Sequence, residues 1–158
     1  MKLRYDAYCG LDCGACPVGL ANELNDEAGL QKMAEEWGVK REDVICSGCK
    51  TATIAPFCAR CEMRICAMEK GLEFCSQCDL FPCKIITDFK NDKAPHHSAI
   101  FENLKEIGKI GVEAWLETEN RRWACGGCGT RFTWYSEKCT SCGEELFNAN
   151  DQEKELQI

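Results

Sequence analysis

Cysteine is the residue that most constrains this chain: 15 of its 158 residues are cysteine, against two histidines. Such a density is typical of short domains held together by disulfides. The odd count excludes a framework in which every cysteine pairs with another of the same chain. Without the cysteines, the apolar residues make a thin core for this length. Metal ions bound by thiolates are therefore expected to contribute to the fold.

The clearest metal motif lies near the C-terminus, where two CxxC pairs are separated by ten residues. Each CxxC turn presents two thiolates, and two turns complete a tetrahedral site. A glycine follows each pair and can adopt the positive φ that such a turn needs. Residues 131–136 are rich in strand-forming side chains. The pattern predicts a rubredoxin-like zinc ribbon with zinc favoured over iron, because zinc is redox-inert. Its ligands would be Cys125, Cys128, Cys139 and Cys142.

Four further CxxC pairs lie in the N-terminal half and would fill two more tetrathiolate sites, by any of three pairings. These pairs are Cys13/Cys16, Cys46/Cys49, Cys58/Cys61 and Cys75/Cys78. Cys9, Cys66 and Cys83 remain; they are buried thiols, exchangeable ligands, or part of an incomplete third site with an open position. The sequence thus predicts two to three zinc ions. The alternatives are an iron–sulfur cluster or thiol redox chemistry in the head (residues 1–83).

An internal repeat runs through the head, with the spacing C-x8-C-x2-C-x4-C occurring twice at an offset of 17 residues. The first copy consists of Cys49, Cys58, Cys61 and Cys66. The second copy shares Cys66 and continues with Cys75, Cys78 and Cys83. Two similar knuckles folded side by side are the interpretation that this spacing favours.

Helical periodicity appears in three places. A helix is predicted from Pro17 through residues 20–37, ending at Gly38. Others are predicted over 96–110 and 112–120. The expected fold is a small α+β protein stapled by metal, with a cysteine-rich metal-binding domain (1–83), a helical connector packed on it (84–118), the zinc ribbon (119–147) and a polar, frayed tail (148–158).

The charge of −7 and the isoelectric point near 5.0 argue against a general nucleic-acid binder. The tail does interleave Arg131 with Trp123, Phe132, Trp134 and Tyr135, a composition found in single-strand binders. We favour the simpler interpretation that the aromatic residues pack the ribbon against the preceding helix, including its Trp115. Nucleic acid is thus not an expected partner, whereas an unidentified protein is.

No apolar stretch of the length of a signal peptide or membrane span occurs in the sequence, so a cytoplasmic protein with reduced thiols is expected. Catalytic motifs are missing as well. Cys9, Cys13 and Cys16 have the spacing of radical S-adenosylmethionine enzymes, but the chain is too short for their barrel. His96 and His97 are adjacent, diverge on a helix and are expected on the surface rather than as ligands. An enzyme is not indicated.

The segment Tyr8–Cys16, with the later CSGC and CARCEMRICAMEKGLEFCSQCDLFPC, resembles the prokaryotic cysteine-rich family described as domain of unknown function 3795. The resemblance covers about residues 5–85, and an appended C-terminal ribbon follows. It implies metal binding, with zinc the expected metal, and no reaction. Asp12, Arg64 and Lys70 would balance or orient the metal sites. The sequence therefore predicts a zinc-binding interaction or adaptor protein.

Overall fold

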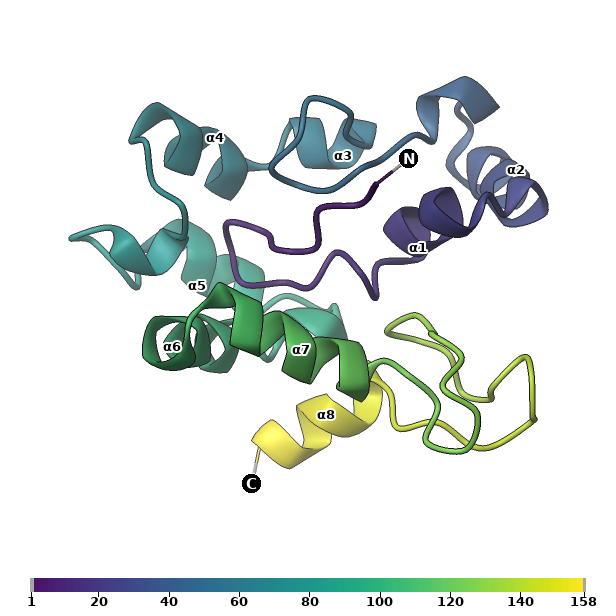
Figure 1. Cartoon of the computed structure of the whole chain (residues 1–158). Helices are drawn as coiled ribbons and strands as arrows, with labels where there is room; N and C mark the ends of the chain where they lie inside the picture. Colours follow the sequence, from purple (N-terminus) through teal and green to yellow (C-terminus); the bar gives the residue numbers. More distant parts are fainter. Residues whose placement is uncertain (1, 158) are drawn as a thin grey trace.

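A computed structural model describes residues 2–157, which form helices joined by short irregular segments (Figure 1). The helices and 3₁₀ turns of the first half are α1 (Pro17–Leu24), α2 (Glu27–Trp37), η1 (Arg41–Asp43), α3 (Pro56–Ala59), α4 (Glu62–Glu69) and η2 (Cys75–Gln77). Those of the second half are α5 (Lys84–Lys90), η3 (Pro95–His97), α6 (Ile100–Ile110), α7 (Val112–Arg122) and α8 (Ala149–Leu156). None of these helices is long and apolar enough to cross a membrane.

The single helix predicted over residues 20–37 is wrong, because the chain breaks between α1 and α2. Asn25 ends α1 in the left-handed conformation with a φ of 54°. The side chain of Asp26 then accepts a hydrogen bond from the backbone N–H of Gly29 and caps α2. Two short polar residues that favour caps over helix interiors thus divide the helix. The predicted cap at Gly38 is confirmed, with a φ of 63°.

The other two predicted helices are present as α6 and α7, but the frayed C-terminus is not. Residues 149–156 form α8, which begins at a capping box made by Asn148 and Asp151. This helix packs against η3. The capping residues and the contact with η3 explain why a polar segment is helical. The final residue, Ile158, lies outside the described residues.

The predicted β component of the ribbon is not observed among residues 2–157. Backbone pairing there is limited to isolated antiparallel bridges, of which Ala124–Arg131 and Lys138–Glu145 flank the two C-terminal CxxC turns. Neither bridge extends into a strand within residues 2–157. The fold is therefore mostly helical, with a four-cysteine cluster near its C-terminus.

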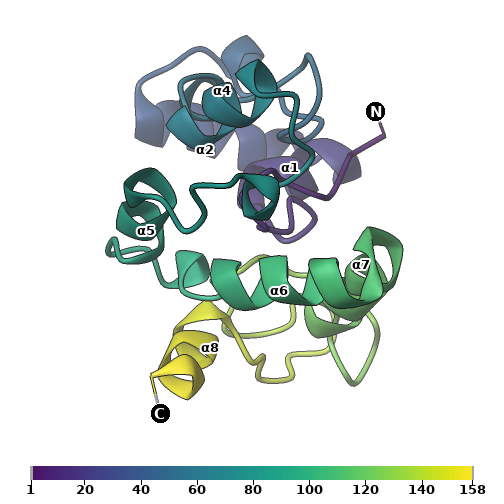
Figure 2. The ribbon, with the colours of Figure 1, turned by 90° about the vertical axis from the view of Figure 1, so that its left-hand side faces the viewer.

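The helices are arranged in layers, and α6 with α7 form the middle one (Figures 1 and 2). The N-terminal segment and α1–α4 lie on one side of this layer and α8 lies on the other (Figure 2). The irregular segment 123–148 also contacts the N-terminal segment, since the N–H of Trp134 donates to the carbonyl of Ala15. Residues of the N-terminal segment contact the middle layer directly. Gly10, with a φ of +86°, packs so closely on Leu104 that a Cβ would overlap it, and its carbonyl accepts a hydrogen bond from Asn103.

Three groups of buried side chains hold the layers together. The first lies between the head and α6, and it includes Phe74, Ile86, Ile100, Leu104 and Trp115. A second lies under the C-terminal segment, and it includes Ala15, Trp123, Phe132, Trp134 and Leu146. The third joins α1 to α2, and it includes Val18, Leu30 and Val44. Cysteines belong to all three groups, so thiols and apolar side chains pack in the same interiors.

Candidate metal centres

The four C-terminal cysteines converge in space as the sequence predicts. The sulfurs of Cys125, Cys128, Cys139 and Cys142, the tail site, all lie within 4.8 Å of one another. Two of the sulfur–sulfur distances, Cys125–Cys142 and Cys128–Cys139, are 3.5 Å. Around one ion with metal–sulfur bonds of about 2.3 Å, tetrahedral sulfurs stand about 3.8 Å apart. The tail site therefore has the size of a site for a single ion.

Local backbone structure builds the tail site, and the two halves do so in the same way. The N–H of Gly129 donates to the carbonyl of Cys125, and that of Gly143 donates to the carbonyl of Cys139. Both glycines have positive φ, 74° and 77°, as predicted. Each turn thus points its pair of thiols toward the other turn, and the site follows from two local motifs.

Two residues next to the tail site were not anticipated from the sequence. Thr130 Oγ1 lies 3.2 Å from the sulfur of Cys128, and Glu144 Oε2 lies 3.6 Å from that of Cys125. Together with the Thr130 backbone and the Cys139 thiol, the Thr130 hydroxyl lowers the pKa of Cys128 to about 6. A lowered pKa favours the thiolate, which is the form that binds a metal. A hydroxyl two residues after the second cysteine of a knuckle is the signal that could have identified Thr130.

The aromatic residues of the tail are mostly packed inside. Trp123, Phe132 and Trp134 are buried, and Tyr135 is exposed. Arg131 donates hydrogen bonds to Glu23 and to the carbonyl of Gly14. This agrees with the predicted packing, except that Trp115 belongs to the other interior, between the head and α6.

Neither histidine belongs to the four-cysteine group, and η3, which carries both, contacts the C-terminal segment. The ring of His96 stacks on that of Trp134 at a centroid distance of 4.0 Å, and burial lowers its pKa to about 3. His97 is buried and is hydrogen-bonded to Asp92 at 2.9 Å. The expectation of a surface position is wrong for His97, which is buried, whereas His96 is half-buried because η3 packs against Trp134 and α8.

The head cysteines lie close to one another but form no comparable closed quartet among residues 2–157, where the tail site is the one group of three or more metal-binding side chains within 4.8 Å. Burial, together with the charge of nearby Cys46, raises the pKa of Cys16 to about 11. Burial and the charges of Cys16 and Cys46 likewise raise the pKa of Cys58. The pKa of Cys9 is raised by burial and by the charges of Cys49 and other thiols. The head thiols thus form one continuous set, and which CxxC pairs share an ion stays a prediction.

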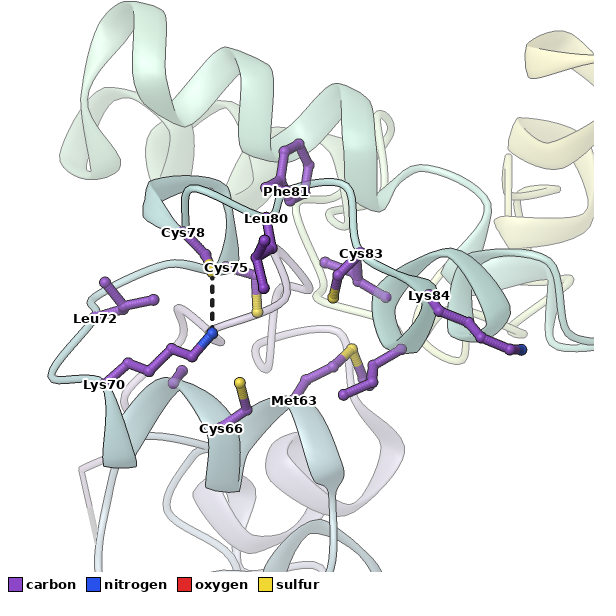
Figure 3. A pocket seen from close by; sticks show the side chains of 13 residues that line it. Met63, Cys66, Lys70, Leu72, Cys75, Cys78, Leu80, Phe81, Cys83 and Lys84 are labelled. Carbon is purple, nitrogen blue, oxygen red and sulfur yellow. Dashed lines mark hydrogen bonds between the residues drawn. The ribbon is translucent and has the colours of Figure 1, made fainter.

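The four cysteines of the second copy of the repeat all line one cavity. Cys66, Cys75, Cys78 and Cys83 line a cavity of about 250 Å³ between α4 and α5 (Figure 3). Burial raises the pKa of Cys75 to about 12, and the nearby Cys61, Cys66 and Cys83 add to the effect. Without a cation such a thiol stays protonated, so any metal bound here would have to displace its proton.

The three charged residues expected near the thiols contact them differently. Asp12 accepts a hydrogen bond from the N–H of Gly14, within the Cys13–Cys16 turn. Arg64 donates to the carbonyl of Cys49 at 2.9 Å. Lys70 donates to the sulfur of Cys78 at 3.3 Å, and of the three it alone bonds a thiol directly. Asp12 and Arg64 therefore orient backbone, whereas Lys70 supplies positive charge to a sulfur.

Comparison with known proteins assigns the head to a family. The profile of the family described as protein of unknown function (DUF3795) matches residues 5–88, more than half of the chain. The protein belongs to the DUF3795 family. The match includes all eleven head cysteines and ends before the tail site, so the four C-terminal cysteines lie outside the DUF3795 region. Searches among curated proteins and among solved structures found no match.

Proposed function

We propose that this DUF3795 protein is a zinc-stabilised binding or adaptor protein, in which one zinc ion at the tail site fixes segment 123–148 against the helical layers. The observation that carries the proposal is the closed quartet of sulfurs within 4.8 Å. Four thiolates complete the tetrahedral coordination of zinc and leave no position for a substrate. Such an ion acts as a folding ligand rather than a catalyst.

Exposure of the site supports zinc over a mononuclear iron. Cys128 and Cys142 are exposed, so dissolved oxygen would reach an iron ion bound there. Zinc has no accessible second oxidation state and is stable in such a position. The cytoplasmic location expected from the sequence would keep these thiols reduced and able to bind it.

A role in protein contact is supported by an exposed aromatic pair on the surface of the head. Trp37, at the end of α2, and Phe57, in α3, pack edge to face with ring centroids 5.4 Å apart. Both side chains remain more than 40% exposed. Aromatic residues are enriched where proteins bind one another. The buried Trp123, Phe132 and Trp134, in contrast, are not free to stack on nucleic-acid bases.

Metal analysis of three proteins tests the proposal: the natural chain, Cys142→Ser and the neighbouring control Ser141→Ala. We expect Cys142→Ser to lower zinc by about one ion per chain and Ser141→Ala to retain it. Chelation of the natural protein should change the fluorescence and near-ultraviolet circular dichroism of the buried Trp123 and Trp134. Loss of iron instead of zinc in Cys142→Ser, or removal of the tail ion without any spectral change, would overturn the proposal.

A further inference from the structure

The cavity lined by the second copy of the repeat contains four cysteine side chains among mainly apolar ones, with Lys70 and Lys84 at its edge. The side chains of Cys66, Cys75 and Cys83 direct their sulfurs into the same space, and Cys78 faces Lys70 (Figure 3). No carboxylate or imidazole lines the cavity. Thiolate ligands without oxygen or nitrogen donors select soft metals, namely zinc, copper(I) and iron–sulfur clusters.

The size of the cavity separates these candidates. The quartet is not among the groups in residues 2–157 whose ligand atoms lie within 4.8 Å of one another. Around a single zinc ion the sulfurs would need to stand about 3.8 Å apart. Here the four cysteines are among the thirteen residues that line a cavity of about 250 Å³. An iron–sulfur cluster places several irons and sulfides between its cysteine ligands, so it needs such a space.

Separate elements carry the four thiols. Cys66 lies in α4, Cys75 begins η2, and Cys83 immediately precedes α5, so three elements carry the ligands. Met63 of α4 and Ile86 of α5 line the cavity and also belong to the buried core between the head and α6. Contraction around one ion would pull these elements away from that core, whereas a larger cluster would leave them in place.

The charge next to the cavity suits a cluster that is net negative. A [4Fe–4S]²⁺ core with four thiolates carries a charge of about −2. Lys70 donates a hydrogen bond of 3.3 Å to the sulfur of Cys78, and hydrogen bonds to cluster sulfurs are among the contacts that tune such sites. The other lysine at the cavity, Lys84, is paired with Asp88 instead.

We propose that Cys66, Cys75, Cys78 and Cys83 bind a [4Fe–4S] cluster. This site is separate from the tail site, and it would give the DUF3795 region a cluster-binding function beyond the structural zinc. Loading from a synthetic [4Fe–4S] thiolate cluster is a ligand exchange. Each cysteine sulfur forms a bond to one iron, one synthetic thiolate leaves that iron, and the cysteine proton goes to the departing thiolate. No atom is oxidised or reduced.

The experiment uses the full chain, prepared without oxygen and treated with that synthetic cluster. We expect a brown protein with about four irons and about four sulfides per chain. Alkylation followed by mass spectrometry then maps the ligands without any variant. The four cysteines of the proposal should be protected in the loaded protein and react in the cluster-free protein. Protection of a different head quartet would overturn the assignment.

Two matched variants provide an independent measurement. Cys83→Ser removes a proposed ligand, whereas Cys58→Ser removes a thiol of the first repeat that does not line the cavity. We expect loss of the brown cluster in Cys83→Ser and retention in Cys58→Ser. Zinc at the tail site and helical circular dichroism report whether each variant folds. Equal retention in both variants, or a colourless natural protein with zinc on the four thiols, contradicts the proposal but leaves the tail zinc unaffected.

Discussion

The tail site and the second-repeat cavity each contain four cysteines, but they arrange the sulfurs in opposite ways. In the tail site the sulfurs lie within 4.8 Å of one another, with space for a single ion. In the cavity the four thiols are part of the lining of a space of about 250 Å³, and they are not among the groups of residues 2–157 whose ligand atoms lie within 4.8 Å of one another. The tail quartet consists of two CxxC pairs, whereas the cavity quartet contains one, and Cys66 and Cys83 lie outside that motif. The difference between the sites arises from what positions these remaining ligands.

Local turns position the tail ligands, whereas tertiary packing positions those of the cavity. The tail quartet consists of two similar knuckles, each closed by its own hydrogen bond to a cysteine carbonyl. The cavity quartet is distributed over α4, η2 and the start of α5, which are joined through buried side chains such as Phe74 and Ile86. We therefore expect a bound metal ion to hold the tail ligands in position and the buried core to hold the cavity ligands in position.

The largest effect that separates the two regions is expected from Ile86→Ala. Ile86 is 1% exposed and forms part of both the core and the cavity wall. Its truncation should destabilise the cluster-free protein by about 2–5 kcal/mol, because a buried side chain is lost and a cavity is left. The adjacent Ile85 is 38% exposed, and its truncation should cost only about 0.5 kcal/mol. Urea unfolding followed by circular dichroism measures both.

The same pair of variants tests whether the tail is independent of this core. Zinc release to a chromophoric chelator under native conditions should be equal in the natural protein, Ile86→Ala and Ile85→Ala. If Ile86→Ala releases zinc much faster, the tail site depends on the head core, and the contrast between a metal-organised and a core-organised region is wrong.

A smaller effect is expected from Thr130→Val, which removes the hydroxyl beside Cys128. The pKa of Cys128, about 6, should rise toward its ordinary value, so that protons compete with zinc more strongly at low pH. Loss of such a supporting contact to a metal ligand weakens binding by roughly 10-fold. Competition titrations at pH 6 and pH 8 should show the larger weakening at pH 6.

Thr140→Val provides the control for this substitution, because Thr140 is an exposed threonine between the cysteines of the second knuckle. It should bind zinc as the natural protein does at both pH values. Equal affinities for Thr130→Val and the natural protein at pH 6 would show that the hydroxyl does not assist the thiolate.

The contrast between the regions also explains what the sequence could predict. The tail ligands follow from spacing, because two CxxC turns and their glycines are local features that need no tertiary information. The repeat is equally visible in the sequence, yet its cavity depends on how Phe74 and Ile86 pack beneath α6.

The helix boundaries show the same limit. The break at Asn25 and Asp26 follows from two cap-forming residues whose effect outweighs the apolar periodicity of the segment. The capping box of α8 was present in the sequence, but contact with η3 decides that the segment is ordered.

The smallest effect concerns the joint between η3 and the C-terminal segment, where the ring of His96 stacks on that of Trp134. Burial lowers the pKa of His96 to about 3, so the folded protein keeps this ring neutral between about pH 3 and pH 6.5, where the unfolded chain protonates it. The unfolded state then binds more protons, and stability is lost as the pH falls below about 6.5. The slope contributed by one such group is at most about 1.4 kcal/mol per pH unit.

His96→Phe keeps an aromatic ring against Trp134 but cannot take up a proton. We expect it to have a flatter dependence of the unfolding free energy on pH between about 6.5 and 5, with stability near that of the natural protein at pH 8. Part of the slope should remain, because burial also lowers the pKa of His97. Tyr135→Phe, which removes only the hydroxyl that contacts His96, is the control and should keep the natural slope. An unchanged slope in His96→Phe would mean that the contact of His96 with Trp134 opens to solvent before the histidine titrates. The tail would then be anchored by its other contacts, namely the apolar ones of Trp123 and Phe132 and the hydrogen bonds of Arg131.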